Sequence, residues 1–234
     1  MSTIKEIIRK RKSVRKYDLT PLDGAELENV KKQIENVKPL YPDIKYSAKI
    51  VSRAKGFLNV KAPHYVIFQS EKKEGYLENI GFIGQQLDLY FSGAGLGSCW
   101  LGTAKPDKKE ASDLTNVLGI SFGKPDEPLH RELADFKRKP LASISEGSDE
   151  RLEAARLAPS GINAQNWYFI AESGKIHCYR KKANPILGFI YDKLACIDLG
   201  IAICHIAEES ESFTFTKEKD PPVRKGCIYT GTVC

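Results

Sequence analysis

The chain has 234 residues, of which 41% are hydrophobic and 28% are charged, and its formal net charge at pH 7 is +6. This length is sufficient to bury a sizeable core as one large domain or two small ones. No apolar run is long enough to span a bilayer and the N-terminal residues lack the apolar core of a signal peptide, so we expect a cytoplasmic protein with no membrane partner.

The cysteines and histidines argue against a metal site. The six cysteines never form a C-x-x-C pair, and the four histidines stand apart from one another in the sequence. This spacing disfavours zinc binding and thioredoxin-like chemistry. Without a secretory signal, free thiols are expected rather than disulfides.

The first half of the chain is predicted to alternate helices and strands. Apolar residues at helical spacing predict helices over residues 3–12 and 22–37. A strand is expected over residues 61–70, followed by a long core helix over 76–93 that ends in a glycine-rich turn. Residues 98–102 are predicted to form a strand lying close to something flat, residues 107–118 an amphipathic helix, and residues 119–128 a turn-rich segment.

The glycine-rich turn is not a dinucleotide fingerprint. Neither Gly93 nor Gly95 can start a G-x-G-x-x-G motif, because the last position would be Ser98 or Trp100. These glycines also follow a helix, whereas the motif follows a strand. A Rossmann fold is therefore rejected.

Small and acidic residues over 143–149 predict a boundary near Glu146, which divides the chain into units of residues 1–145 and 146–234. The second unit is predicted to contain a helix over 149–157, a loop over 158–167, strands over 167–170 and 175–179, and a helix over 195–209 that runs into a charged tail. Residues 64–71 resemble residues 167–173, and Ile83-Gly84 resembles Leu199-Gly200. The two units are interpreted as two copies of one unit.

The positive charge is concentrated near the N-terminus, where residues 9–16 (RKRKSVRK) carry six basic side chains in eight positions. The segment is a solvated helix face, a nucleic-acid patch or a phosphate site. Beyond Tyr17 no stacking aromatics are interleaved with the charges and no nucleic-acid motif accompanies them, so no nucleic-acid partner is expected. Ser13 between Lys12 and Arg15 favours a phosphate site, because a hydroxyl and two cationic groups can converge on one phosphate.

Residues 158–167 (APSGINAQNW) combine turn formers, amide groups and a large aromatic residue. Pro159 is expected to end the preceding helix, because the residue before a proline is pushed out of the α region. The hydroxyl and amide side chains suit a flat ligand rich in heteroatoms. Alternatively, they cap the backbone of their own loop.

Four segments together, residues 11–17, 95–102, 138–141 and 158–167, resemble the signature segments of the FMN-dependent nitroreductase family. The resemblance implies an α+β fold of two degenerate α/β units with mainly antiparallel sheets and long core helices. The P-S-x-x-N-x-Q loop usually comes early in that family, whereas here it lies in the second half, so each half lacks what the other keeps. We therefore expect a monomer that acts as a pseudo-dimer and binds one FMN. Asn166 replaces the proline that usually precedes the tryptophan.

The resemblance also implies which residues bind the cofactor. The basic segments would meet the FMN phosphate, the strand at 100–102 would pass along the ring edge, and the loop at 159–165 would approach from the other half. The implied cofactor-binding residues are Arg11, Lys12, Ser13, Arg15, Trp100, Leu101, Gly102, Arg138, Lys139, Pro159, Ser160, Asn163 and Gln165.

The function implied is an FMN-dependent NAD(P)H oxidoreductase that passes hydride from a nicotinamide to FMN and on to a nitroaromatic, quinone or similar acceptor. Because the flavin carries the chemistry, no catalytic triad or paired carboxylates are needed. No motif distinguishes NADH from NADPH. The alternative is a flavin-binding protein of the same fold with little or no reductase activity.

Overall fold

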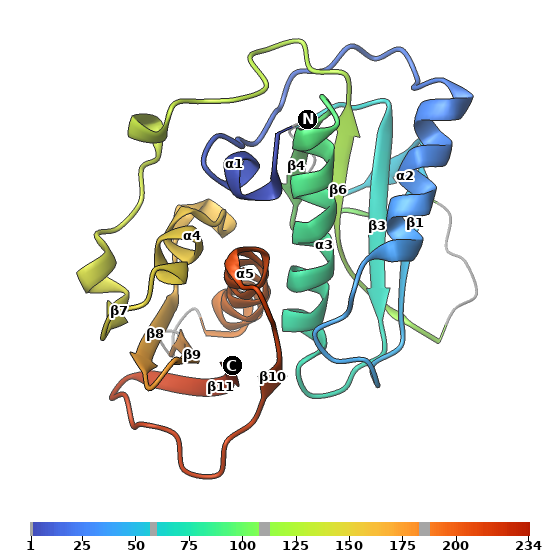
Figure 1. The fold of residues 1–234 in the computed structure, drawn as a ribbon. Coiled ribbons are helices and arrows are strands. Elements are labelled where there is room, and N and C mark those ends of the chain that lie inside the picture. Colours follow the sequence, from blue (N-terminus) through green and yellow to red (C-terminus); the bar gives the residue numbers. More distant parts are fainter. Residues whose placement is uncertain (1, 57–59, 108–112, 183–187) are drawn as a thin grey trace.

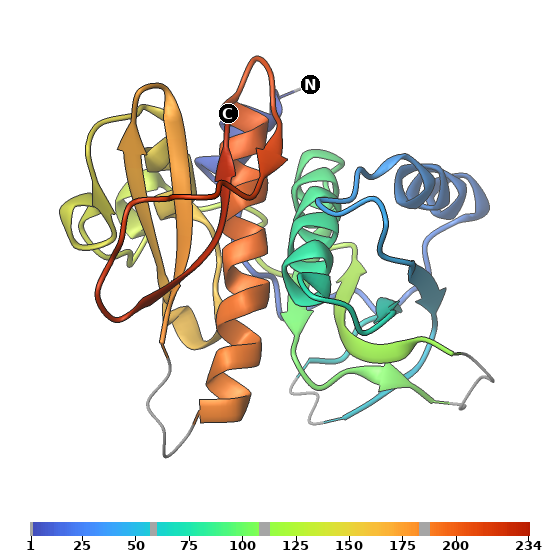
Figure 2. The same ribbon diagram turned by 90° about the horizontal axis from the view of Figure 1, so that it is seen from below.

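Two long helices lie side by side at the centre of the molecule, and each has a β-sheet on its outer side (Figures 1 and 2). They are α3 (Tyr76–Gly93) and α5 (Gly188–Glu209). The structure is a computed structural model and describes residues 2–56, 60–107, 113–182 and 188–234. Within these ranges no helix combines the length and hydropathy that crossing a bilayer requires.

The first sheet has four antiparallel strands and covers the outer side of α3 (Figure 2). Its order is β1 (Tyr46–Val51), β3 (His64–Ser70), β6 (Thr115–Gly123) and β4 (Gly97–Leu101). The two-residue strands β2 (Ala54–Lys55) and β5 (Lys105–Pro106) pair separately. Two further helices, α1 (Ile4–Ile8) and α2 (Gly24–Asn36), each begin with a capping box.

The second sheet has five strands, and α5 lies between it and α3 (Figure 2). Its order is β10 (Phe215–Thr216), β11 (Cys227–Val233), β9 (Lys175–Lys181), β8 (Trp167–Glu172) and β7 (Ser145–Glu146). All its pairs are antiparallel except that of β7 with β8. Between β6 and β8 in the sequence, the chain also forms α4 (Arg151–Leu157) and the short 3-10 turns Leu133–Asp135, Leu141–Ser143 and Gly161–Asn163.

The helices α3 and α5 touch through their backbones at two glycines. A Cβ atom on Gly81 would lie 2.1 Å from the carbonyl oxygen of Ile197, and one on Gly200 would lie 2.0 Å from the carbonyl oxygen of Glu78. The contact is reciprocal, because each glycine meets the carbonyl three residues before the other glycine. This close approach explains why two helix interiors contain glycine, which costs about 1 kcal/mol relative to alanine.

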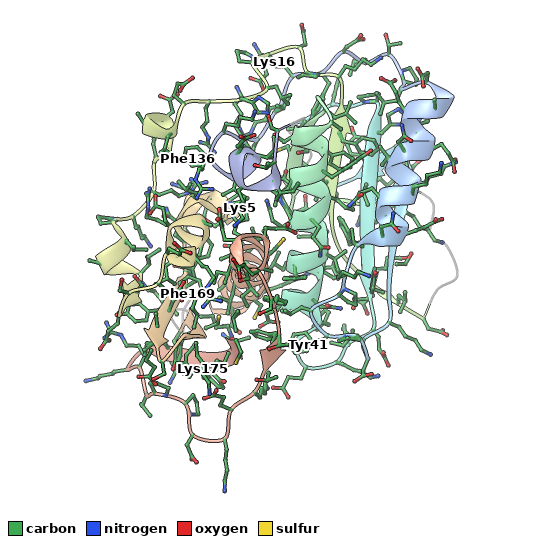
Figure 3. The ribbon with its side chains drawn as sticks, viewed as in Figure 1. Lys5, Lys16, Tyr41, Phe136, Phe169 and Lys175 are labelled. Atoms are coloured by element: carbon green, nitrogen blue, oxygen red, sulfur yellow. The ribbon has the colours of Figure 1, made fainter. Side chains whose placement is uncertain are left out.

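One continuous apolar core joins both sheets to both long helices. Side chains fill the space between them, the fully buried Phe169 of β8 among them (Figure 3). The sequence resemblance between residues 64–71 and 167–173 corresponds to β3 and β8, which are both buried central strands. The glycine that matches Gly200 in the helix crossing, however, is Gly81 rather than the expected Gly84.

Most predicted elements are present, with ends that differ by several residues. The helix predicted over 3–12 already ends at Ile8, and the helix predicted over 195–209 begins at Gly188. The strands predicted over 61–70, 98–102, 167–170 and 175–179 correspond to β3, β4, β8 and β9. The helices predicted over 22–37, 76–93 and 149–157 correspond to α2, α3 and α4.

The helix predicted over 107–118 is wrong where it can be compared, because residues 115–118 belong to strand β6; residues 108–112 lie outside the described part. The turn-rich segment expected over 119–128 is likewise wrong over 119–123. Strand β6 pairs with β3 on one side and with β4 on the other. Tertiary pairing thus overrides the local helical pattern.

The prediction of a charged tail after residue 209 is also wrong, because two strands form there. Strand β11 pairs with β9 along its length, and β10 pairs with β11 at the sheet edge. The side chains from Thr230 to Val233 are buried. Charged residues are frequent between β10 and β11, so the sequence pattern did not reveal that β11 is a strand of the second sheet.

Candidate functional site

Two adjoining cavities lie where β4, α5 and the loop after α4 meet. The first, here called the apolar cavity, has a volume of about 160 Å³. The second, here called the basic recess, has a volume of about 530 Å³. They share five lining residues, namely Ser13, Arg15, Pro159, Ser160 and Ile162.

Segments from both halves of the chain line the apolar cavity. Strand β4 contributes Cys99, Trp100 and Gly102, and α5 contributes mainly aliphatic side chains together with Asp198. The Trp100 ring packs on α3 at Gly84, where a Cβ atom would lie only 2.5 Å from it. Glycine at this position therefore makes room for an aromatic side chain at the cavity edge.

Cations gather in the basic recess. Its lining includes six basic side chains, those of Arg11, Lys12, Arg15, Arg131, Lys137 and Arg138, against the two acidic side chains of Glu127 and Asp135. The formal excess is therefore four positive charges. The guanidinium of Arg15 is exposed and has no hydrogen bond or ion pair with any residue that the structure describes. Such a recess favours an anionic ligand.

Arg138 shows how crowded these cations are. Burial, followed by repulsion from Arg131 and Arg11, lowers the pKa of Arg138 to about 9. Its guanidinium and that of Arg131 both lie over the ring of Phe136, at 5.5 and 4.0 Å from the ring centroid. An anion in the recess would relieve this repulsion.

Arg11 borders the recess, but its charge is already compensated. Its Nε lies 3.0 Å from Asp88 Oδ2, and the two side chains are 1% and 0% exposed. Asp88 also accepts hydrogen bonds from Ser98 Oγ at 2.7 Å and Gln85 Nε2 at 3.1 Å. The Nη2 of Arg11 reaches Ser13 Oγ at 3.3 Å. Direct contact between Arg11 and a phosphate stays a prediction. The contact that the structure shows is the hydrogen bond from Arg11 to Ser13.

The loop after α4 is bound to residues 137–139 by its amide side chains. Asn163 Nδ2 donates to the carbonyl oxygen of Lys137 at 2.7 Å and its Oδ1 accepts from Arg138 Nη1 at 2.6 Å. Gln165 Oε1 accepts from the backbone N–H of Lys139 at 2.7 Å. The loop therefore braces the wall of the basic recess. It also caps part of its own backbone, because Ser160 Oγ accepts from the backbone N–H of Gln165 and Gln165 Nε2 donates to the carbonyl oxygen of Asn163.

Ten of the thirteen predicted cofactor-binding residues line one of the two cavities, and the exceptions are Leu101, Lys139 and Gln165. Leu101 belongs to a small core cluster with Val14 and Tyr17. Lys139 donates through Nζ to the Ala164 carbonyl at 2.6 Å, and Gln165 is buried. The lining residues that sequence reasoning missed include Glu127, Arg131, Lys137, Ile162 and Asp198. A lone carboxylate within the apolar stretch at 195–204 (ACIDLGIAIC) was the available signal for Asp198.

Backbone strain is concentrated in the same loop. Ile162, Asn163 and Gln165 have φ angles of 49°, 58° and 49°. Left-handed backbone costs a non-glycine residue about 1–3 kcal/mol, and a β-branched residue there is an outlier. Ile162 lines both cavities although the residue is 78% exposed. Strain and apolar exposure at one residue make Ile162 a candidate ligand contact.

We expect Ile162→Gly to raise the free energy of unfolding by about 1 kcal/mol, because glycine relieves the left-handed strain. Urea unfolding measures the change. Leu19→Gly is the matched control: Leu19 is also an exposed apolar residue, at 58%, but it is not among the residues with positive φ. The control should lose stability. Equal losses in both variants would contradict the strain at Ile162.

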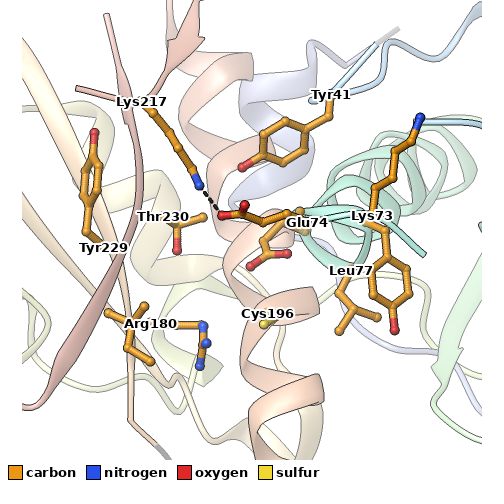
Figure 4. A pocket seen from close by; sticks show the side chains of 13 residues that line it. Tyr41, Lys73, Glu74, Leu77, Arg180, Cys196, Lys217, Tyr229 and Thr230 are labelled. Carbon is orange, nitrogen blue, oxygen red and sulfur yellow. Dashed lines mark hydrogen bonds and ion pairs between the residues drawn. The ribbon is translucent and has the colours of Figure 1, made fainter. Parts of the chain in front are cut away.

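A further cavity of about 430 Å³ lies between the start of α3 and the second sheet (Figure 4). Its cations are already paired, Lys73 with Glu71, Lys217 with Glu74, and Arg180 with Asp192. This cavity is lined on α3 by Glu78, which lies three residues before Gly81. The apolar cavity is lined on α5 by Ile197, which lies three residues before Gly200. The two cavities thus occupy matching places on the paired helices, and the uncompensated positive charge lies beside the apolar cavity.

The chain matches one family model and several solved structures. A family model described as "Putative TM nitroreductase" matches residues 3–210. A putative nitroreductase from Thermotoga maritima has 23% identity and a TM-score of 0.67 over 99% of this chain and 92% of its own. A nitroreductase family protein from Clostridium difficile has 17% identity and a TM-score of 0.50 over 64% and 99%.

An FMN-dependent nitroreductase from Clostridium difficile has 18% identity and a TM-score of 0.43 over 56% of this chain and 93% of its own. No curated protein matches the chain. The structural likenesses show a shared α+β fold with antiparallel sheets, and the family model spans most of the sequence. The chain therefore belongs to the nitroreductase family.

Proposed function

We propose that the protein is an FMN-dependent NAD(P)H oxidoreductase that passes hydride from a nicotinamide to FMN and on to a nitroaromatic, quinone or similar acceptor. One observation carries the proposal: an apolar cavity opens beside a recess lined by six basic and two acidic side chains, and five residues line both. FMN has a matching division into a flat ring system and a phosphate. Membership of the nitroreductase family supports the same conclusion.

The residues present fit FMN at both ends. The phosphate would lie in the basic recess, where the unpaired Arg15 and the Ser13 hydroxyl are available and Lys12 and Arg138 add positive charge. Charge-assisted hydrogen bonds of this kind are roughly twice as strong as neutral ones. The ring would lie toward the apolar cavity along Trp100, whose Nε1 is buried without a hydrogen-bond partner among the described residues.

When bound, FMN would supply the hydride chemistry. The residues of this chain bind and orient the cofactor and exclude water. Leu118, Leu194 and Ile197 make the cavity apolar, which strengthens every polar contact inside it. Gly102 leaves space beside the cavity, because a Cβ atom there would lie 4.0 Å from the nearest atom, in Leu194. The braced loop holds Ser160 against both cavities.

We further propose that the chain is a single-chain pseudo-dimer of units 1–145 and 146–234 that binds one FMN as a monomer. The first sheet is built from residues between 46 and 123, and the second from residues between 145 and 233. The reciprocal contacts of Gly81 and Gly200 support an approximate two-fold relation between the units. The paired charges around the second cavity support a single cofactor site.

The spectrum of the purified protein, with its FMN content, tests the cofactor. Anaerobic mixing with NADH or NADPH then tests turnover, because a reductase loses its flavin absorbance and regains it when a quinone or nitroaromatic is added. A yellow protein that neither nucleotide bleaches would establish the alternative of a flavin-binding protein without reductase activity. A colourless protein that binds no added FMN would contradict both.

Arg15→Ala is expected to weaken FMN binding by about 10- to 100-fold, which corresponds to the roughly 1.5–3 kcal/mol of a hydrogen bond to a charged group. Titration of the FMN-free protein, followed by flavin fluorescence, measures this change. Lys16→Ala is the matched control, because Lys16 is an exposed cation next to Arg15 that lines neither cavity. Equal effects of the two substitutions would show that only net charge matters and would contradict the phosphate assignment.

A further inference from the structure

Asp198 is a buried residue that lines the apolar cavity, and one of its two carboxyl oxygens has no hydrogen-bond partner among the described residues. It lies in the middle of α5, and the residue is only 3% exposed. Its Oδ1 accepts a hydrogen bond from the backbone N–H of Gly161 at 2.9 Å. Its Oδ2 is buried and has no hydrogen-bond partner among the described residues. An unsatisfied polar atom in such a place needs an explanation, and a missing ligand is one.

Among the residues that the structure describes, none forms an ion pair with Asp198. Burial raises the pKa of Asp198 to about 8, and the hydrogen bond from Gly161 offsets only part of this shift. The other ionisable side chains that line the cavity are Arg15, which is exposed, and Cys99, whose own pKa is raised by burial. The carboxyl is therefore protonated at neutral pH. Because Oδ1 accepts from Gly161, Oδ2 is the oxygen that is free to carry the proton.

We propose that the Oδ2–H of Asp198 is the specificity-determining hydrogen-bond donor of the apolar cavity, directed at a carbonyl, nitro or ring-nitrogen acceptor of a planar ligand. The inference rests on the proposed function, which places such ligands here. A carboxylic acid offers a donor where an ionised aspartate would offer only acceptors. The cavity would therefore select ligands with an acceptor at this point and reject anions there.

The test compares Asp198→Asn and Asp198→Leu with the wild type in FMN titrations of the cofactor-free protein between pH 6 and 9.5. Asparagine keeps an acceptor for Gly161 and a donor at the second position, but it does not ionise. Wild-type affinity is expected to fall above pH 8, approaching tenfold per pH unit because one pKa unit corresponds to a tenfold change. Asp198→Asn should lack the part of this fall that comes from Asp198, whereas the part that comes from loss of the Arg138 charge near pH 9 should remain in both proteins. Asp198→Leu should bind about tenfold more weakly than the wild type at pH 7.

A second arm identifies the ligand that accepts the hydrogen bond. Here 2-methyl-1,4-naphthoquinone is titrated into the FMN-loaded proteins without a reductant and followed by perturbation of the flavin spectrum. An Asp198-dependent pH profile in the FMN arm assigns the acceptor to the flavin ring, and one in the quinone arm assigns it to the second substrate. Profiles that match those of Asp198→Asn in both arms would overturn the inference.

A readout without any ligand comes from the stability of the cofactor-free protein. Burial raises the pKa of this carboxyl from its ordinary 3.8 to about 8, so the folded state holds a proton that the unfolded state releases within this window. Stability should fall as pH rises from about 4 to about 8, with up to a tenfold loss in the folding constant per pH unit. Asp198→Asn should remove this contribution. An unchanged slope would contradict the protonated carboxyl.

Glu78→Gln is the matched control for both readouts. Glu78 is a buried carboxyl on α3 whose pKa is also raised by burial. It lines the other cavity, the one of about 430 Å³ whose cations are paired, and not the apolar cavity. Its substitution should alter the pH dependence of stability and leave the pH profile of FMN binding unchanged. Wild-type protein that binds no FMN at any pH would overturn the proposed function, which separates that failure from a failure of Asp198.

Discussion

Replacing Gly81 or Gly200 with alanine is expected to lower the free energy of unfolding by about 3 kcal/mol or more, the upper range for overpacking a core. Either Cβ atom would meet a backbone carbonyl oxygen of the facing helix at about 2 Å. A backbone atom cannot turn away as a side chain does, so α3 and α5 must separate. Urea unfolding of the single variants measures the loss.

The same contact makes a second, sharper prediction about the double variant. Because the first alanine already forces α3 and α5 apart, the second should cost less than it does alone, and the two losses should not add. Gly93→Ala is the control on α3, since its Cβ atom would meet nothing closer than 3.7 Å. It should be neutral or slightly stabilising. A loss at Gly81 no larger than that at Gly93 would contradict the backbone contact.

The helix crossing also bears on the candidate site. The apolar cavity lies between α5 and strand β4, so a displaced α5 carries Asp198 and Ile197 away from Trp100. FMN binding should therefore weaken in those glycine variants that still fold. The glycine contacts between α3 and α5 therefore also hold the α5 wall of the apolar cavity in place.

Asp88→Asn is expected to cost about 3–5 kcal/mol in the free energy of unfolding, because it leaves the charge of Arg11 buried without a partner. Both side chains are almost completely inaccessible, and Arg11 Nε lies 3.0 Å from Asp88 Oδ2. Thermal or urea unfolding at neutral pH measures the loss. Glu28→Gln is the control, because it breaks an ion pair with Lys31 in which both side chains are more than half exposed. Such exposed pairs contribute about 0–1 kcal/mol.

A double-mutant cycle separates the pair from its surroundings. Arg11→Met removes the buried charge, so adding it to Asp88→Asn should restore part of the lost stability. Failure of the second substitution to restore any stability would show that the buried charge is not the cause. Asp88 also binds Gln85, whose Nε2 lies 3.1 Å from Nε2 of His205 on α5. The pair therefore belongs to a polar network that links the two long helices and reaches Ser13 through Arg11.

Local patterns in the sequence predicted the elements whose causes are local. Helical spacing and a glycine-rich end located α3, and Pro159 ended α4 at Leu157 as expected. The basic segment and the 158–167 loop were recognisable as candidate ligand-binding segments because of their residue types, and the structure brings both to the two adjoining cavities. Their joint pattern was enough to predict the family and the fold class, which the family model and the structural neighbours confirm.

Only the tertiary structure decided what depends on distant partners. Residues 115–118 form a strand because β3 and β4 pair with them, although their local pattern suggested a helix. Lys139 and Gln165 bind each other across the recess wall, and Asp88 neutralises Arg11. Asp198 became a candidate only when folding placed it, buried and half-satisfied, opposite β4. A one-dimensional pattern records the chemistry a side chain carries, whereas burial and neighbouring charges, which decide how that chemistry is used, arise from contacts far apart in the chain.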